Sequence, residues 1–201
     1  MARRLRGVLD ALRSGARGRQ RTAVSALAEG SDRLFAMAAL DLGYRLEVLL
    51  PCQSADYETT FGDPSTTEAY RALLARADSV RELPGALTDS KAAYEAVGHA
   101  TVSATNVLIA VWDGRPAAGR GGTPEIIAHA LALGRPVIWI DAARSRLPGL
   151  IAAPTASGSR EISLDRLASR ARPLTRRRLA QIGARLTGAM DFAERHERTK
   201  P

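Results

Sequence analysis

Two glycine-containing stretches carry the residue types that can hold an anion. The first, "LAEGSDRL", covers residues 27–34, and the second, "GRGGTPEI", covers residues 119–126. Each follows a predicted strand and precedes a predicted helix, so the free N–H groups and the dipole of a helix N-terminus lie beside it. In the second stretch, Gly121 and Gly122 would let the backbone approach a phosphate, and Thr123 could cap the helix that begins at the following proline. Both stretches are therefore candidate phosphate sites.

The second stretch also has a plainer interpretation. Thr-Pro-Glu is by itself a strong helix start, because proline suits the first helical position and Glu125 complements the dipole in the first turn. The stretch is not a Walker loop, since no Gly-Lys-Ser/Thr follows, and its glycine spacing does not fit the dinucleotide-binding fingerprint. From this stretch alone, a phosphate cradle and a simple helix start both remain open.

The elements that position these loops alternate between strand and helix periods. Strands are predicted at residues 22–27, 45–51, 107–112 and 136–141, a short extended piece at 79–83, and helices at 31–43, 66–78, 90–102 and 124–134. Strands separated by helices of this length predict an α/β fold, a parallel sheet with helices on both faces. In such a sheet a ligand lies beyond the carboxyl ends of the strands, which is where both loops fall.

Taken together, the segments around the two loops resemble the SLOG superfamily. They are "VSALAEGSDRLFAMAAL" with "LEVLLPC", and "YEAVGHATVSATNVLIAVWDGRPAAGRGGTPEIIAHALALGRPVIWID", within residues 23–141. This Rossmann-like superfamily links DNA-processing proteins, LOG-type phosphoribohydrolases and nucleotide-sensing domains of bacterial antiviral defence. The patterns of its two loops are most similar to those of the sensors. The resemblance implies a Rossmann-like fold in which both loops surround a nucleotide.

The candidate ligand-binding residues follow from this resemblance and from the chemistry of the loops. Arg115 and Arg120 stand in "DGRPAAGRGG" and suit a phosphate clamp, and Tyr94 and Trp112 could stack on a base. The full candidate set is Ser25, Glu29, Gly30, Asp32, Arg33, Trp112, Asp113, Gly114, Arg115, Gly119, Arg120, Gly121, Gly122, Thr123 and Glu125.

The resemblance also bears on catalysis. LOG-type enzymes carry Pro-Gly-Gly-x-Gly-Thr-x-x-Glu and an upstream Arg-Lys pair, whose Arg and Glu are implied in N-glycosidic cleavage. The matching positions here hold Val97, Gly98 and Ile126, and Glu125 stands one position early. We therefore expect a nucleotide-binding sensor or regulatory domain, whose ligand is a mononucleotide, a cyclic oligonucleotide or an NAD derivative. A nucleoside monophosphate phosphoribohydrolase, with Glu125 as its catalytic carboxylate and a loop arginine as its cation, is the alternative.

The amino-terminal segment departs from the sensors. Sensor-like relatives open with a strand and a loop before their first helix, and that strand lies near the middle of the sheet beside the ligand. This sequence opens with the basic helix "ARRLRGVLDALRSG". We expect either a shortened variant or a start that lies inside the fold.

Positive charge is confined to the two ends of the chain. The net charge is +8, but residues 1–22 and residues 160–201 contribute +6 each, which leaves −4 for the residues between them. We expect a basic N-terminal helix (1–22), a SLOG-like nucleotide-binding domain (23–145), and a linker with a basic helical C-terminal extension (146–201). The basic ends predict solvated amphipathic helices, with weak contact to nucleic acid or an acidic partner as the alternative.

The remaining features mainly exclude functions. An apolar stripe near the carboxyl end (Leu174, Leu179, Ile182, Leu186 and Met190) predicts packing on the chain's own domain or a homodimer or higher homo-oligomer. No metal or cofactor is expected, because no Cys/His cluster has ligand spacing, and His99, His129 and His196 are expected to be structural. No apolar run is long enough to span a bilayer, and no secretion signal is seen, so we expect a cytoplasmic protein without a membrane contact.

Overall fold

Strands and helices alternate through the first two thirds of the chain, as the two periods of its apolar residues predict. The structure is a computed structural model and describes residues 1–15, 18–116, 121–152 and 167–197, with residues 170 and 187–197 as backbone only. Its elements are α1 (Ala2–Ser14), β1 (Thr22–Ser25), α2 (Ser31–Asp41), β2 (Arg45–Leu50), α3 (Ser54–Glu58), α4 (Pro64–Leu74), β3 (Ser79–Glu82), η1 (Leu87–Asp89), α5 (Ser90–Ser103), β4 (Leu108–Trp112), α6 (Thr123–Ala132), β5 (Val137–Asp141), β6 (Gly149–Ile151), η3 (Ala168–Arg170), β7 (Arg172–Pro173) and α7 (Arg176–Glu197).

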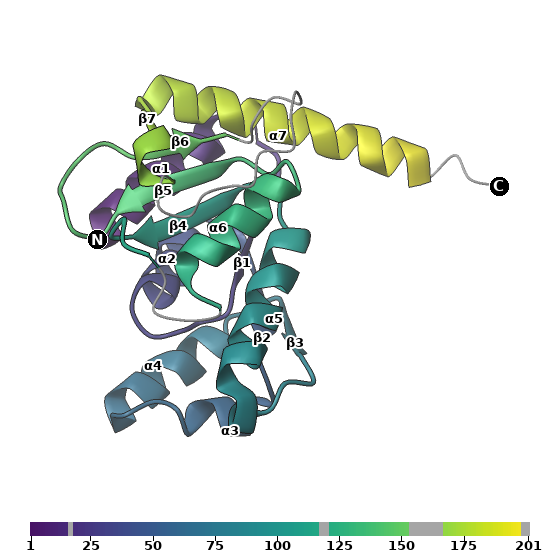
Figure 1. Ribbon diagram of the computed structural model, residues 1–201. Coiled ribbons are helices and arrows are strands. Elements are labelled where there is room, and N and C mark those ends of the chain that lie inside the picture. Colours follow the sequence, from purple (N-terminus) through teal and green to yellow (C-terminus); the bar gives the residue numbers. More distant parts are fainter. Residues whose placement is uncertain (16–17, 117–120, 153–166, 198–201) are drawn as a thin grey trace.

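The strands form two sheets, and the prediction of an α/β fold with parallel strands is confirmed. The first sheet has the order β1-β2-β3 and is parallel, and the second has the order β4-β5-β6-β7. In the second sheet β4 and β5 are parallel, whereas β6 and β7 are antiparallel to their neighbours. The expected single sheet is thus divided into two. The division falls between β1, an edge strand of the first sheet, and β4, an edge strand of the second, which lie next to each other in Figure 1.

Helices cover both faces of the second sheet, because its central strand is apolar on both sides. Val137 and Trp139 of β5 belong to a core with α6, in which Ile127 and Leu131 are buried. Ile138 and Ile140 face the other way and pack with α1 and α7. The alternation of side chains along β5 therefore assigns one helical layer to each face.

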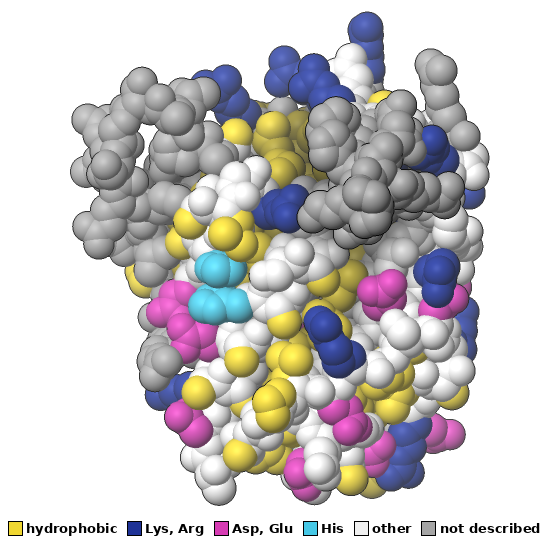
Figure 2. Space-filling view, turned by 90° about the vertical axis from the view of Figure 1, so that its right-hand side faces the viewer, with side chains coloured by type: hydrophobic (Ala, Val, Ile, Leu, Met, Phe, Trp, Pro, Cys, Tyr) yellow, Lys and Arg dark blue, Asp and Glu magenta, His cyan; other side chains and the backbone are white. Residues whose placement is uncertain are grey.

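The first sheet packs mainly against α2 and α4. Its central strand β2 contributes Leu46, Val48 and Leu50 to a core that also contains Ala39 of α2 and Leu73 of α4. Helix α5 lies against β2 and also contacts α6, so it adjoins elements of both halves of the molecule. His99 and His129, on α5 and α6, stack with ring centroids 3.9 Å apart on the face shown in Figure 2.

Both basic ends of the chain pack against the α/β unit. Helix α1 buries Leu5, Val8 and Leu12, and it lies beside α2 and α7. Leu174 and Leu179 of the predicted apolar stripe join the same core and Ile182 packs against it, so the expected packing of this stripe on its own domain is confirmed for those three residues. The side chain of Met190 lies outside the described residues.

The segment expected to be a linker contributes to the second sheet. Residues 149–151 form β6, which pairs with β5, and β7 pairs with β6. Each is too short for its apolar pattern to predict a strand.

Within the described ranges, no helix is both long enough and apolar enough to cross a membrane.

Candidate functional site

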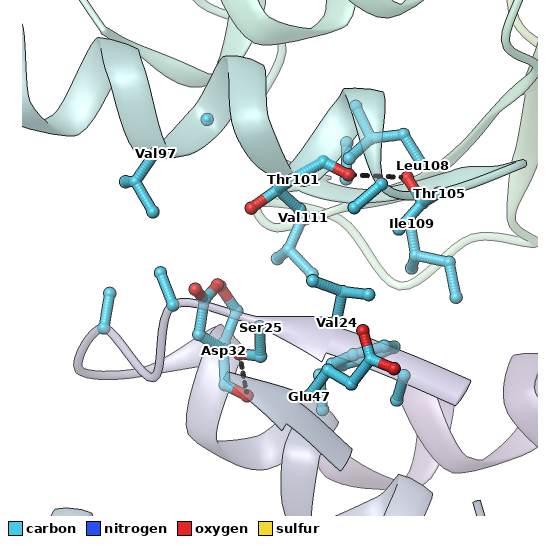
Figure 3. Close-up of a pocket in the computed structure, with 18 of the residues that line it drawn as sticks. Val24, Ser25, Asp32, Glu47, Val97, Thr101, Thr105, Leu108, Ile109 and Val111 are labelled. Atoms are coloured by element: carbon cyan, nitrogen blue, oxygen red, sulfur yellow. Dashed lines mark hydrogen bonds between the residues drawn. The ribbon is translucent and has the colours of Figure 1, made fainter. Parts of the chain in front are cut away.

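A cavity of about 1050 Å³ lies between the facing edges of β1 and β4. Residues 22–25 line it from β1 and residues 108–111 from β4. Figure 3 shows Val24, Ser25 and Asp32 on one side of this interstrand cavity, and Val97 and Thr101 of α5 on the opposite side. The division of the sheet and this cavity thus have the same location.

The two predicted loops meet at one end of this cavity. The first loop lines it with Ala28, Glu29, Ser31 and Asp32, and the second with Gly121 and Thr123. These six residues, which we call the mouth, follow the carboxyl end of β1 or lie at the start of α6. The structure therefore brings together residues that are 90 or so positions apart in the chain, roughly as the carboxyl-edge argument for parallel sheets predicts.

The first loop leaves β1 through a tightly bonded turn. Leu27 is fully buried and has a positive φ of 54°, and its N–H donates to the hydroxyl of Ser25 at 3.1 Å. Gly30 has a φ of 91° and is the N-cap of α2, which begins at Ser31. Ser25 is buried and lines the cavity, whereas Gly30 is exposed and does not.

Asp32 is the acidic group held at the mouth. Burial raises the pKa of its carboxyl, and backbone hydrogen bonds with Ala28 and Ala26 act in the opposite direction. The pKa of Tyr57 is raised chiefly by its burial and next by the charge of Asp32, and both residues line the cavity. A carboxylate in this position can accept hydrogen bonds from the hydroxyl groups of a sugar.

Arg33, the next residue, points away from the cavity. Its Nε donates to the carbonyl oxygen of Leu27 at 3.0 Å, and its NH1 group donates to that of Thr66. The guanidinium lies over the ring of Phe61, 4.3 Å from the centroid, and the residue is 7% exposed. Arg33 was predicted to contact the ligand, and the structure places it behind the loop, where it supports the turn at Leu27.

The second loop is held by its own glutamate. Gly121 has a φ of 76°, and its N–H donates to the carboxylate of Glu125 at 2.6 Å. A Cβ at Gly121 would lie 3.0 Å from the backbone nitrogen of Glu95, so the loop packs directly on α5. Helix α6 begins at Thr123 with Gly122 as its N-cap, one residue earlier than predicted. Gly122 and Glu125 do not line the cavity.

The other predicted residues of the second loop lie outside the lining. Trp112 is buried, and its Nε1 donates to the carbonyl oxygen of Arg115 at 2.7 Å, so its ring belongs to the core with Trp139. Arg115 is exposed and pairs with Asp113 at 3.6 Å. Gly114 also stands away from the cavity. Gly119 and Arg120 fall outside the described residues.

The positions that would be catalytic in a LOG-type enzyme do gather at the cavity. Val97, Gly98 and Ile126 all line it. A Cβ at Gly98 would lie 2.5 Å from Cδ1 of Ile126, so α5 and α6 are in close contact there. None of the three side chains can carry a charge. These three positions therefore supply neither a cation nor a carboxylate to the cavity.

An aromatic wall beside the mouth was largely missed by sequence reasoning. Tyr57, Phe61 and Tyr94 line the cavity, and the ring of Tyr57 lies edge-on to Phe61 and Tyr94 at 5.1 and 6.5 Å. Only Tyr94 was a candidate. The spacing of four between Tyr57 and Phe61 is a weak helical signal, because α3 spans only residues 54–58 and ends before the second ring.

Comparisons with known proteins add no identification. No family model matches the chain, and no curated protein matches it. In the ranges that the structure describes, no group of three or more His, Cys, Asp or Glu side chains could hold a metal ion.

Proposed function

We propose that this protein binds a nucleotide or a nucleotide-derived molecule at the mouth of the interstrand cavity, as a sensor or regulatory module. The observation that carries this proposal is the convergence of Glu29 and Asp32 from one loop with Gly121 and Thr123 from the other on a single cavity. The resemblance to SLOG-type sensors of antiviral defence supports the same ligand class and, with it, a cytoplasmic location and a homo-oligomeric state.

Each part of a nucleotide has a matching surface. The N-terminus of α6, where Thr123 lines the cavity, offers a backbone N–H group to a phosphate. Carboxylates of Glu29 and Asp32 can accept ribose hydroxyls, and the rings of the aromatic wall can stack on a base. Of the candidate arginines, Arg33 is engaged behind its loop and Arg115 stands outside the lining, so backbone groups carry the phosphate in this proposal.

Binding without turnover is favoured over hydrolysis. A phosphoribohydrolase needs a carboxylate and a cation at the reacting centre. Val97, Gly98 and Ile126 occupy the corresponding positions at the cavity. Glu125, the alternative carboxylate, is engaged with the N–H of Gly121.

The basic ends support nucleic-acid binding only weakly. Arg4 donates to the carbonyl oxygen of Asp141, and Arg176 pairs with Asp10 at 2.6 Å, so arginines of both ends are used inside the fold. On the face shown in Figure 2, Lys and Arg gather near the top and are interspersed with acidic and apolar side chains below. Weak, salt-sensitive contact with nucleic acid or an acidic partner is the most that we propose for them.

A thermal-shift screen with mononucleotides, cyclic nucleotides, NAD and NAD derivatives tests the proposal. A bound ligand at about 100 times its dissociation constant adds ~2.7 kcal/mol of stability. Asp32→Asn and Gly122→Val should each abolish most of the shift, since valine tolerates the backbone of Gly122 (φ −72°, ψ 158°) but obstructs approach to the helix N-terminus.

The matched control is Asp41→Asn, an exposed aspartate at the other end of the same helix α2. It should leave the ligand-induced shift unchanged. A screen without any hit, or hits that survive both mouth substitutions, would contradict the proposal. Release of free base by the wild-type protein would restore the hydrolase alternative.

A further inference from the structure

The strands β1 and β4 each have one unpaired edge, and these edges face each other. Among the described residues, β1 pairs only with β2 and β4 pairs only with β5, both in parallel. N–H and C=O groups leave a strand in both directions within the sheet, so the unpaired edges direct theirs into the interstrand cavity that they line.

Helices cover the space between these edges on both sides, as they cover the interior strands of a sheet. Leu5 and Leu9 of α1, with Phe35 of α2, line the cavity together with Val97 of α5 and Ile126 of α6. Edge strands exposed to solvent are normally protected by proline, lysine or bulges, whereas "TAVS" and "LIAVW" contain no proline or lysine. Backbone groups that are enclosed in this way need hydrogen-bond partners.

The cavity is also larger than its mouth requires. Its volume of about 1050 Å³ is at the upper limit of the roughly 300–1,000 Å³ found for small-molecule pockets. The part between residues 22–25 and residues 108–111, which we call the slot, lies between the unpaired edges of β1 and β4. A strand forms hydrogen bonds on both of its sides, so one extended strand in the slot would satisfy both edges.

We propose that the slot is the seat of one extended strand, hydrogen-bonded in parallel to both β1 and β4 and supplied by polypeptide joined to the amino end of α1. This strand joins the two sheets into one, in the order β3-β2-β1, inserted strand, β4-β5-β6-β7. Since the helices cover the slot mainly with apolar side chains, the strand is a run of largely apolar, β-branched residues. The inference does not depend on the proposed function, because the slot and the mouth are lined by different residues.

The position of α1 identifies the source of the strand. NH1 of Arg4, in the first turn of α1, donates to the carbonyl oxygen of Asp141, the last residue of the parallel strand β5, at 2.6 Å. Helix α1 therefore begins at the edge of the sheet where a parallel strand in the slot would end. It then runs along the cavity, which it lines with Leu5, Leu9 and Leu12, and the chain returns to β1. Inserted strand, α1 and β1 form one β-α-β unit.

Hydrogen exchange on an extended chain tests the slot. The probe is an amino-terminal extension of about eight alternating Val, Ile and Thr residues with a short glycine-containing loop, and its control has proline at alternate positions. With the probe, amide exchange in both β1 and β4 should slow by at least about tenfold, whereas the proline control should not change it. Equal exchange with both extensions would overturn the proposal, as would full protection of β1 and β4 amides without any extension.

Two further measurements test the source. Intact mass and amino-terminal peptides of the protein isolated from its own cells should show residues ahead of Met1, and a chain whose first residue is Met1 would overturn the assignment to this chain. Protection of β1 and β4 that rises with the concentration of the unextended protein would show that a second copy supplies the strand, and would overturn it too. None of these readouts requires a nucleotide, so they remain informative if the proposed function fails.

Discussion

The two loops at the mouth are held in place in different ways. The first is held from behind by a buried cation, because Arg33 binds the carbonyl oxygen of Leu27 and stacks on Phe61. The second is held by a carboxylate of Glu125 and by the absence of a side chain at Gly121, which packs on the backbone of α5. In each loop a charged residue that was a candidate for the ligand serves its own backbone instead.

This comparison shows how neighbouring positions divide their roles. Successive residues of a helix point about 100° apart, so Asp32 can line the cavity while Arg33 turns into the core. The first loop should therefore be sensitive to the loss of a charge, and the second to the addition of atoms. The predictions below test this difference.

The largest expected effect is that of Arg33→Ala on stability. The substitution removes charge-assisted hydrogen bonds to two carbonyl groups and a cation–π contact from a buried site, and it leaves a void. We expect the free energy of unfolding, measured with urea, to fall by about 3 kcal/mol. Arg45→Ala is the control, since Arg45 is an exposed arginine whose ion pair with Asp78 should contribute little. Equal losses in the two variants would show that Arg33 does not support the loop.

A smaller effect is expected from Gly121→Ala, with Gly43→Ala as its control. Both glycines have a φ of 76°, but a Cβ at Gly121 would lie 3.0 Å from a backbone nitrogen, whereas a Cβ at Gly43 would have no atom within 4 Å. The control should lose about 1 kcal/mol from conformational strain alone, and Gly121→Ala about 2 kcal/mol or more. The same urea measurement gives the difference. Indistinguishable variants would contradict the close packing of the second loop on α5.

The smallest effect is a gain of stability in Asp32→Asn. A folded-state pKa raised above the ordinary value of 3.8 means that the fold favours the neutral carboxyl, so the ionised group weakens the fold at neutral pH. The variant should resist urea slightly better than the wild type at pH 7. As the pH falls through the folded-state pKa toward 3.8, Asp32 of the wild type becomes protonated and loses its unfavourable charge. The advantage of the variant should therefore vanish over this range. An advantage that is constant across this pH range would exclude the titration of Asp32 as its cause.

Much of the fold could be predicted from periodicity alone. The strands β1, β2, β4 and β5 and the helices α2, α5 and α6 agree with their predicted positions to within two residues. Short elements escaped prediction, as α3 and β6 did, because three to five residues carry too little of either period. Packing of the basic helix α1 on the sheet could not be inferred from its charge, although Leu5, Val8 and Leu12 supply an apolar face.

The candidate site was predicted in outline, but several of its contacts were not. Loop position followed from the carboxyl-edge rule, and the resemblance implied Glu29, Asp32 and Thr123 as ligand-binding residues, all of which line the cavity. The inward turn of Arg33 depends on Thr66 and Phe61, which are more than 25 positions away in the chain. Such a contact cannot be predicted from the residues that neighbour Arg33 in the sequence.

The most direct test of nucleotide binding is a backbone NMR titration with the ligand that gives the largest thermal shift. Amides of residues 28–32 and of Gly121, Gly122, Thr123 and Glu125 should move together, with one dissociation constant, because both loops contact the same molecule. The same titration of Asp32→Asn should move neither set at equal ligand concentration. Shifts confined to α1 and α7, or to only one of the two loops, would contradict the account of a shared site at the mouth.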